Sequence, residues 1–350
     1  MIETSSKHIL VIRLSAMGDV AMMVPVIKAM IRTYPTIKIT VVSRGFLKPI
    51  FKDIPNVSFF TADVKGKHKG IYGLYKLYKE LKALQIDVVA DLHNVLRSKI
   101  LGFYFKLGGY KVCKIDKGRA EKKALTRTKD KIFKQLKTTH ERYADVFSKL
   151  GYSVTFTKED VLPQLQLTKK VALFIGEDQK KWIGIAPFAA FAGKTYPLSQ
   201  MEAVISKLSS TKKYKIILFG GPAEKKQLAS WQNNYENVIN CAGLFSFEEE
   251  LILIANLDIM LSMDSGNAHL AAMYGKKVVT IWGITHPYAG FYPFGQKPEN
   301  ALLADKAQYP LLPTSIYGNK YPKGYENVMQ TISPQVVFDK IVEVLARLKQ

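Results

Sequence analysis

Short apolar runs, typical of buried strands, alternate along the chain with segments whose apolar residues have helical spacing. This order predicts a parallel α/β protein. A nearly continuous apolar run at residues 8–14 is typical of a buried parallel strand. Residues 20–31 then carry apolar side chains at helical spacing, with Pro25 in the first two turns, where proline is tolerated better than in a helix interior. A second strand is predicted at residues 38–43, and this alternation of strand and helix favours a parallel sheet.

The same alternation occurs twice along the chain, which predicts two α/β domains. In the first series a further strand is expected at residues 86–92 and a helix at 140–150. The pattern loosens around residues 160–180, and we therefore place the domains at 1–165 and 166–332. The second series is predicted to contain strands at 182–187, 214–219, 237–240, 257–262 and 277–282, and helices at 199–209 and 247–255.

The last segment, residues 333–350, is predicted to be an amphipathic helix. Ser333 is a favourable N-cap, and Pro334 suits the first helical position. Before it, residues 286–325 are rich in Pro, Gly and Tyr, which indicates ordered loops around a site rather than disorder.

Composition limits the class of protein. At 350 residues and 47% hydrophobic, the chain can bury substantial cores. Cys113 and Cys241 are far apart and suggest neither a disulfide framework nor a thiolate metal site. No apolar run reaches the ~18 residues of a spanning helix, and the first residues do not resemble a signal peptide. These features predict a cytoplasmic protein.

The net charge of +22 is unevenly distributed and indicates an anionic partner. Residues 1–165 contain 31 Lys and Arg against 14 Asp and Glu, whereas residues 166–350 contain 20 against 15. Nucleic acid, an anionic membrane surface and a phosphorylated glycolipid all fit this charge, and so does simple solubility. Residues 111–137, with eleven basic and three acidic side chains, are predicted to be a mobile cationic loop.

Residues 65–85 mix Lys with Tyr and Leu at helical spacing, which has two interpretations. The segment is either a basic amphipathic surface near lipid headgroups or an ordinary surface helix that packs its leucines inward. The second interpretation is the preferred one. The leucines concerned are Leu74, Leu77, Leu81 and Leu84.

Candidate chemistry is concentrated at residues 263–272, where a predicted strand turns into a helix. An Asp-Ser-Gly turn of this kind exposes backbone N–H groups at a helix N-terminus, which attracts phosphate. Asp264 lies beside this turn, and His269 lies about one helical turn further on. The segment therefore predicts a site for a nucleotide diphosphate.

A second candidate is Asp19, in the turn after the first strand. The turn is not G-x-G-x-x-G, and the chain contains no P-loop motif. Asp19 is either a helix N-cap or a ligand-facing carboxylate at the carboxyl end of a strand, and its position alone favours the cap.

Four segments, in this order, resemble glycosyltransferase family 9, the heptosyltransferases of lipopolysaccharide assembly. Each motif is short, but four in register are specific. Residues 9–20 resemble the family's opening strand and S-x-x-G-D turn, 193–197 its K-x-[WY]-P element, 220–224 its G-G-P-x-E turn, and 264–272 its D-[ST]-G-x-x-H-L-A-A signature.

The resemblance implies the GT-B fold, an α/β architecture of two Rossmann-like domains facing across a cleft. The N-terminal domain would bind the acceptor and the C-terminal domain the nucleotide-sugar, with the terminal helix packing back on the N-terminal domain. The implied reaction is inverting transfer of a sugar from a nucleotide-diphospho-sugar, ADP-heptose in the best-known members, to a lipopolysaccharide core or related glycolipid. No catalytic metal or other cofactor is expected.

The resemblance also implies roles for single residues. Asp19 would be the general base, and Lys194 would neutralise the departing diphosphate as the second catalytic residue. The acceptor would be held by Arg97, Lys99 and Arg119. The donor would be held by Ser15, Gly18, Glu224, Leu244, Phe245, Asp264, Ser265, Gly266 and His269.

We therefore expect a monomeric transferase that takes an anionic glycolipid at the inner face of the inner membrane and does not bind nucleic acid. Two departures from the family leave a sugar other than heptose as an alternative. Alanines at positions 189, 190 and 192, where the family often has hydroxylated residues, weaken a phosphate role for that turn, and the cysteines that many relatives carry before the terminal helix are absent. Other functions compatible with the sequence are a sugar-nucleotide epimerase on the same fold, a transferase-like scaffold without activity and a basic nucleic-acid-binding protein.

Overall fold

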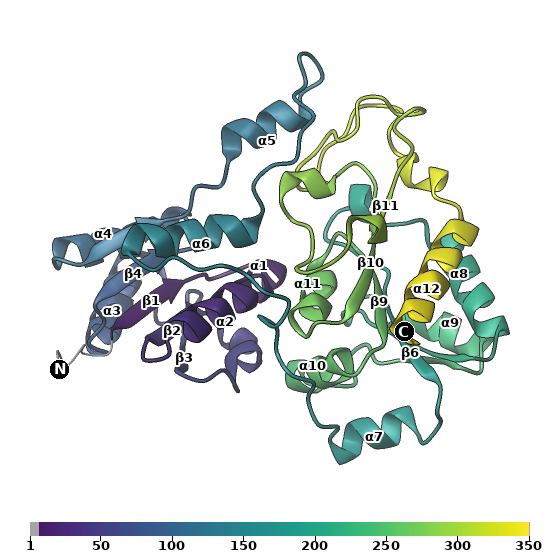
Figure 1. The fold of residues 1–350 in the computed structure, drawn as a ribbon, viewed down its shortest axis with the longest axis horizontal. Helices are drawn as coiled ribbons and strands as arrows, with labels where there is room; N and C mark the ends of the chain where they lie inside the picture. Colours follow the sequence, from purple (N-terminus) through teal and green to yellow (C-terminus); the bar gives the residue numbers. More distant parts are fainter. Residues whose placement is uncertain (1–6, 350) are drawn as a thin grey trace. The chain divides into compact units, whose positions relative to one another are not determined.

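The chain forms two α/β units, each built on a parallel sheet (Figure 1). The computed structural model describes residues 7–349. The first unit contains the chain up to Lys117 together with Thr139–Leu162. The second contains Gly118–Thr138 together with the chain from Pro163 onward.

The first unit has a five-stranded sheet in the order β3-β2-β1-β4-β5, with all neighbours parallel. The apolar residues of strand β1 are all buried because helices cover both faces of the sheet. The strand therefore does not alternate between apolar and polar residues, as a strand with one solvent-exposed face would. The strands are β1 (His8–Ile12), β2 (Lys38–Ser43), β3 (Val57–Thr61), β4 (Val88–Asp91) and β5 (Lys111–Lys114).

Helices α3 and α4 pack side by side and share one hydrophobic core with this sheet, and α2 packs against α6. The core under α3 and α4 includes Leu10 and Ile12 of β1 together with Leu77 and Phe105. The helices of the first unit are α1 (Met17–Ala21), α2 (Met23–Thr33), α3 (Gly70–Lys82), α4 (Leu96–Leu107) and α6 (Thr139–Leu150), with a 3-10 turn η1 at Gly45–Phe51.

The second unit has a six-stranded sheet in the order β11-β10-β9-β6-β7-β8, again with parallel neighbours. Strand β6 lies in the middle and pairs with both β7 and β9. The strands are β6 (Lys181–Ala186), β7 (Tyr214–Leu218), β8 (Val238–Asn240), β9 (Ile259–Met263), β10 (Lys277–Trp282) and β11 (Ala301–Leu303).

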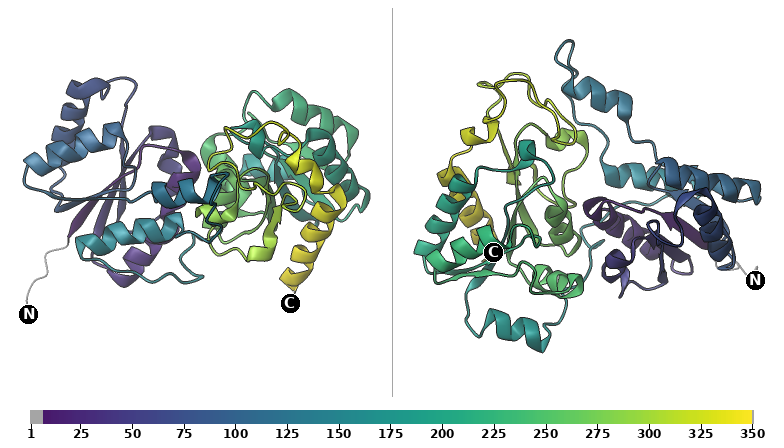
Figure 2. Two further views of the ribbon diagram at one scale, coloured as in Figure 1. Left: turned by 90° about the horizontal axis from the view of Figure 1, so that it is seen from above. Right: turned by 180° about the vertical axis from the view of Figure 1, so that it is seen from behind.

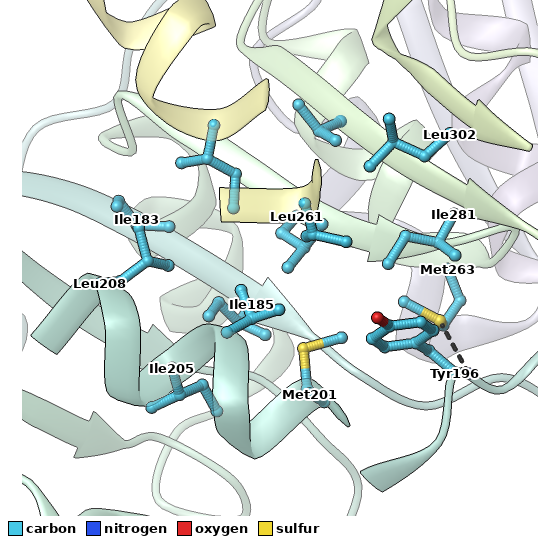
Figure 3. Close-up of a cluster of buried hydrophobic side chains, with 14 of the residues drawn as sticks. Ile183, Ile185, Tyr196, Met201, Ile205, Leu208, Leu261, Met263, Ile281 and Leu302 are labelled. Carbon is cyan, nitrogen blue, oxygen red and sulfur yellow. Dashed lines mark hydrogen bonds between the residues drawn. The ribbon is translucent and has the colours of Figure 1, made fainter. Parts of the chain in front are cut away.

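A single large core connects this sheet to the helices on one of its faces, as Figure 3 shows for Ile183, Ile185, Leu208 and Leu261. The helices of the second unit are α5 (Arg119–Thr126), α7 (Lys169–Ile175), α8 (Leu198–Ser210), α9 (Lys225–Asn234), α10 (Phe247–Ala255), α11 (Gly266–Met273) and α12 (Pro334–Ala346). Short 3-10 turns occur at η2 (Ala192–Lys194), η3 (Pro287–Ala289), η4 (Pro298–Asn300), η5 (Val328–Thr331) and η6 (Arg347–Lys349).

The domain division differs from the predicted one in two places. The chain passes into the second unit after Leu162, close to the predicted boundary, but Gly118–Thr138 also belongs to that unit. This segment is held there by Leu125 and Leu136, which are buried with Ala289. Residues 111–137 are also not the continuous loop that was predicted, because strand β5 and helix α5 both lie within them.

The terminal helix is correctly predicted, and the structure shows which residues of its own unit it packs against. Ser333 caps α12 by accepting a hydrogen bond from the N–H of Val336 at 3.3 Å. The buried face of α12, with Val337 and Ile341, packs against α8 in the core of the second unit. The helix therefore completes the layer of its own sheet (Figure 2).

This division changes the interpretation of the charge. The first unit contains 23 basic and 12 acidic residues, and the second contains 28 and 17. Each unit therefore carries +11, and the apparent concentration of charge in the first half of the chain arises because Gly118–Thr138 folds with the second unit.

Candidate functional site

In each sheet the strand order reverses beside the first strand of the unit. The reversal lies between β1 and β4 in the first unit and between β6 and β9 in the second. Open α/β sheets bind ligands outside the carboxyl ends of their strands at such a point. Each unit thus has one expected site, and the candidate residues can be compared with both.

Asp19 lies at the reversal point of the first unit. Its carboxylate Oδ2 lies 2.5 Å from Nη2 of Arg13 and accepts the N–H of Ala16 at 3.2 Å. Asp19 is not an N-cap, because Ala16 holds that position for α1 and Asp19 lies three residues further on. About a quarter of the Asp19 side chain is exposed, whereas Arg13 is buried. The carboxylate is therefore both fixed in orientation and open to a ligand.

Arg13 is held from several sides and acts as a positioning residue for Asp19. Its Nη1 donates to the carbonyl of Leu92, which follows β4, at 2.7 Å. Burial by itself would lower the pKa of Arg13, but interactions with Tyr143 and Asp19 outweigh it and raise that pKa. The hydroxyl of Tyr143 also donates to the backbone carbonyl of Asp19 at 3.2 Å, which connects α6 to the turn.

His93 is a second side chain at this reversal point that sequence reasoning did not single out. Its Nδ1 accepts the N–H of Leu14 at 3.3 Å, so the ring hydrogen of the neutral tautomer is on Nε2. Burial, followed by the charges of Arg13 and Lys117, lowers the pKa of His93 to about 3. His93 is therefore neutral at physiological pH and presents one N–H donor near Asp19.

The neutral state of His93 predicts how stability depends on pH. The pKa of the folded state is about 3 and that of the unfolded state about 6.5, so only the unfolded state gains a proton between these values. The contribution is fully present above the unfolded pKa and is lost as pH falls toward the folded one.

When the pH is lowered from 7 to 5, the parent protein should lose about 2 kcal/mol more of its unfolding free energy than the variant His93→Asn. Asparagine keeps an acceptor for the N–H of Leu14 but does not gain a proton in the unfolded state. Urea unfolding at the two pH values measures this difference. Equal losses in the two proteins would show that His93 is not held neutral.

The loop after β6 and the end of β9 form the site of the second unit. Nζ of Lys194 lies 2.9 Å from Oδ2 of Asp264, and both side chains are largely buried. The N–H of Tyr196 donates to Sδ of Met263 at 3.3 Å, as drawn in Figure 3, and the hydroxyl of Tyr196 donates to the carbonyl of Ile332. The loop with Lys194 is thereby fixed to the strand that ends beside Asp264.

Helix α11 begins at the same edge of the sheet. Ser265 is its N-cap, with extended backbone, and the hydroxyls of Ser265 and Ser262 are 3.0 Å apart. The first N–H groups of the helix, beginning at Gly266, have no acceptor within the helix and carry its partial positive charge. His269 lies on the buried side of this helix.

Two further turns belong to the second unit. Glu224 is the N-cap of α9, and a Cβ placed on Gly221 would lie 2.8 Å from its carboxylate Oε2, so this carboxylate lies over the glycine turn. Phe245 packs edge-on against Phe174 of α7 at 4.9 Å, whereas Leu244 is 45% exposed.

The structure therefore separates the predicted residues into two groups. Ser15 and Gly18 lie with Asp19 in the first unit, although both were predicted to bind the donor together with residues of the second. Arg97 and Lys99 are exposed near the start of α4 in the first unit. Arg119, predicted to join them, is the first residue of α5 and belongs to the second unit.

Two general features concern metals and membranes. Within residues 7–349, no three His, Cys, Asp or Glu side chains are close enough together to hold a metal ion. Among the same residues, every helix is too short or too polar to cross a membrane.

Comparison with known proteins identifies the family. The model of glycosyltransferase family 9 (heptosyltransferase) matches residues 74–312. Lipooligosaccharide heptosyltransferase 2 of Haemophilus influenzae is 27% identical over 368 aligned residues, which cover 97% of this chain and 100% of that protein.

Solved structures agree on the fold. A glycosyltransferase family 9 protein from Veillonella parvula has a TM-score of 0.75 at 20% identity and 99% coverage of both chains. The E. coli ADP-heptose lps heptosyltransferase II has a TM-score of 0.69 at 18% identity, with 98% of this chain and 100% of that chain covered. The predicted GT-B fold is confirmed, and the family match over more than half of the sequence shows that this chain is a glycosyltransferase that belongs to family 9.

Proposed function

We propose that the protein transfers heptose from ADP-heptose to the core of a lipopolysaccharide or a related glycolipid, with inversion at the anomeric carbon. The relatives support this substrate class, because curated family members of similar length are named lipopolysaccharide and lipooligosaccharide heptosyltransferases. The observation that carries the proposal is the Lys194–Asp264 pair beside the start of α11, a combination suited to a diphosphate with an attached sugar.

In the proposed reaction the acceptor hydroxyl oxygen attacks the anomeric carbon of the donor sugar. The new glycosidic C–O bond forms as the bond to the diphosphate breaks, and the diphosphate leaves with the bonding electrons. Asp19 takes the proton of the attacking hydroxyl, and Arg13 keeps the carboxylate in position. A single displacement of this kind needs one carboxylate and gives an inverted product.

The charge that develops on the departing diphosphate would be stabilised by Lys194 and by the N–H groups at Ser265 and Gly266. A lysine and a helix N-terminus together supply the positive potential that many transferases obtain from a metal ion. On this basis we propose transfer without an obligatory metal. Asp264 and His269 would contact the sugar and phosphates, Glu224 the ribose, and Leu244 and Phe245 the base.

The first unit is proposed to hold the acceptor. Three cations lie near this end of the sheet: Arg13, Lys117 and Arg44 each lower the pKa of His93, whereas Asp19 raises it. Nε of Arg44 donates to the carbonyl of Leu14 at 3.1 Å, so this cation is fixed beside the turn. Such a surface suits an acidic acceptor sugar. We further propose that Arg97, Lys99 and Arg119 contribute to acceptor binding, that Ser15 and Gly18 shape the turn at the reacting sugar, and that the protein acts as a monomer.

A ligand screen tests the donor assignment. ADP-, GDP-, UDP- and dTDP-linked sugars are compared for their effect on thermal unfolding, and ADP-heptose is expected to give the largest stabilisation. At a concentration 100 times its Kd, a ligand stabilises the folded state by about 2.7 kcal/mol. Product analysis with and without acceptor then separates transfer from epimerisation. A response to a different sugar nucleotide, or to none, would contradict the assignment.

Gly318 provides a test that changes no charged group. A Cβ at this position would lie 2.3 Å from Cγ and 2.5 Å from Cδ of Lys194, so Gly318→Ala must displace the lysine side chain. Because small misplacements of a catalytic group reduce rates strongly, we expect kcat to fall by about 10- to 100-fold.

The matched control for this change is Gly295→Ala. Gly295 also has a positive φ, of 67° compared with 79° for Gly318, but a Cβ there meets nothing within 4 Å. The control therefore introduces similar backbone strain and leaves Lys194 in place. Equal effects of the two alanines on kcat would attribute the loss to strain and not to Lys194.

A further inference from the structure

Helices α3 and α4 carry an outer surface that the proposed chemistry does not use. Along α4 the exposed apolar side chains are Leu96, Phe103 and Leu107, with 74%, 57% and 70% of each accessible. Their spacing of seven and eleven residues places them in one row on the side of the helix opposite its buried residues. Exposing such a row of apolar side chains to water is unfavourable, which suggests that the row contacts a partner.

Aromatic side chains continue this apolar row across to α3. Tyr104 of α4 contacts Tyr75 of α3 edge-on, with ring centroids 5.4 Å apart. On α3, Tyr75 is 44% exposed and Tyr72 is 91% exposed. We call the exposed side chains Tyr72, Tyr75, Leu96, Phe103 and Leu107 the α3–α4 face. Because the two helices pack side by side, this face is two helices wide (Figure 2).

Lysines flank the α3–α4 face at both edges. On α3, Lys76 and Lys79 are exposed, and Nζ of Lys79 lies 5.2 Å from the centre of the Tyr75 ring. On α4, Lys106 lies on the side turned away from the Tyr104 contact, according to the helical spacing. Helix α4 contains no acidic residue, and within residues 7–349 no carboxylate pairs with Lys76, Lys79 or Lys106.

From this arrangement we infer that the α3–α4 face docks on the surface of an anionic phospholipid bilayer. Leucine and phenylalanine enter the boundary between headgroups and acyl chains, and tyrosines lie at the headgroup level. The long stems of the flanking lysines follow the apolar surface while their ammonium groups reach lipid phosphates. A second copy of the chain is a poor partner, since it would oppose the same lysines.

The inference does not depend on the transfer chemistry and goes beyond it. It assigns a membrane-contacting role to exposed residues of the first unit that have no role in the proposed transfer. It also revises the interpretation of residues 65–85. The leucines Leu74, Leu77 and Leu81 do pack inward as in an ordinary helix, and the opposite side of that helix is basic and aromatic. Leu84, also expected to pack inward, follows the end of the helix and is exposed.

The test is flotation of the full chain with phosphatidylcholine vesicles that either contain or lack phosphatidylglycerol. Binding is expected only to the anionic vesicles. We expect Phe103→Ser combined with Leu107→Ser, and separately Lys76→Glu combined with Lys106→Glu, each to weaken it by about tenfold or more. Transfer to a water-soluble acceptor should stay unchanged in both variants, which separates a failure of this inference from a failure of the proposed function.

Controls come from the second unit. Leu173 is 84% exposed on α7, and Leu173→Ser should leave vesicle binding unchanged. Lys212 and Lys213 are exposed, and their replacement by Glu controls for net charge. Binding that survives both α3–α4 variants overturns the inference. Binding that is lost in the lysine variant but kept in the serine variant also overturns it, because that result indicates a purely electrostatic partner such as nucleic acid.

A third variant keeps the inference testable if either double variant fails to fold. Phe103→Trp places an indole at the centre of the face, while of the three native tryptophans Trp231 and Trp282 are buried and Trp182 of the second unit is half-buried. Relative to the parent protein, its emission should shift to the blue on anionic vesicles and be quenched by brominated lipid. Unchanged emission on vesicles that bind the protein would place the contact elsewhere and overturn the inference.

Discussion

Asp19→Asn should reduce kcat by about 100-fold to about 10,000-fold while leaving the fold and donor binding intact. Asparagine has nearly the same shape and can still accept from Ala16 and Arg13, so the turn keeps its geometry. It cannot take a proton from the acceptor hydroxyl. The proposed donor-binding side chains Lys194 and Asp264 are in the second unit and are unchanged.

Steady-state kinetics measures the loss of kcat, and calorimetry with ADP measures donor affinity. Asp53→Asn is the matched control, because Asp53 is an exposed carboxylate of the same unit. It changes the charge equally and should leave kcat within about twofold of the parent. If Asp19→Asn retains transfer at a similar level, Asp19 is not the base.

Lys194→Met should lower kcat by about 100-fold to about 1000-fold. Methionine retains most of the volume of the side chain and removes the charge that we propose stabilises the departing diphosphate. It also leaves Asp264 buried without its cation, so the ligand-free protein should be destabilised. Thermal unfolding measures the second effect independently of the first.

Asp264→Asn added to Lys194→Met separates these two effects. Removing the unpaired carboxylate should recover stability without restoring kcat, and this non-additivity is expected for two residues in contact. Lys213→Met, at an exposed lysine of the same unit, is the control for loss of one positive charge. A double variant that regains kcat would mean that Lys194 acts only by neutralising Asp264.

Several elements were predictable because their signal is local. The terminal helix has a serine cap followed by proline, and the structure begins it at Pro334. Strand β10 and helix α10 have the predicted bounds, since apolar runs and a Ser–Glu capping box define them within a few residues. The predicted helix at 20–31 is instead two helices, because the chain breaks at Met22 and α2 takes Pro25 into its first turn.

Other features had no local signal. Strands β3 and β11 are short and partly exposed, so they lack the continuous apolar run of a buried parallel strand. Helix α4 presents apolar side chains to solvent, so it lacks the pattern of an amphipathic helix. The role of Arg13 was hidden within an apolar strand. His93, like Asp19, follows the carboxyl end of a predicted strand, and the same rule could have identified it. That the two side chains lie near each other depends on the pairing of β4 with β1, which the sequence does not show.

The sequence by itself determined the class of fold, the two α/β series and the family, and it supplied Asp19, Lys194 and Asp264 as candidate site residues, because all of these depend on short-range periodicity and on motifs within single turns. Only the tertiary structure decided that Gly118–Thr138 and α12 belong to the second unit, that Arg13 fixes Asp19, and that Lys194 meets Asp264. The Lys194–Asp264 pair and the packing of α12 join segments far apart in the chain, and Arg13, although close to Asp19 in sequence, is held by the carbonyl of the distant Leu92. Burial and strand pairing select such contacts from many that the same local pattern permits.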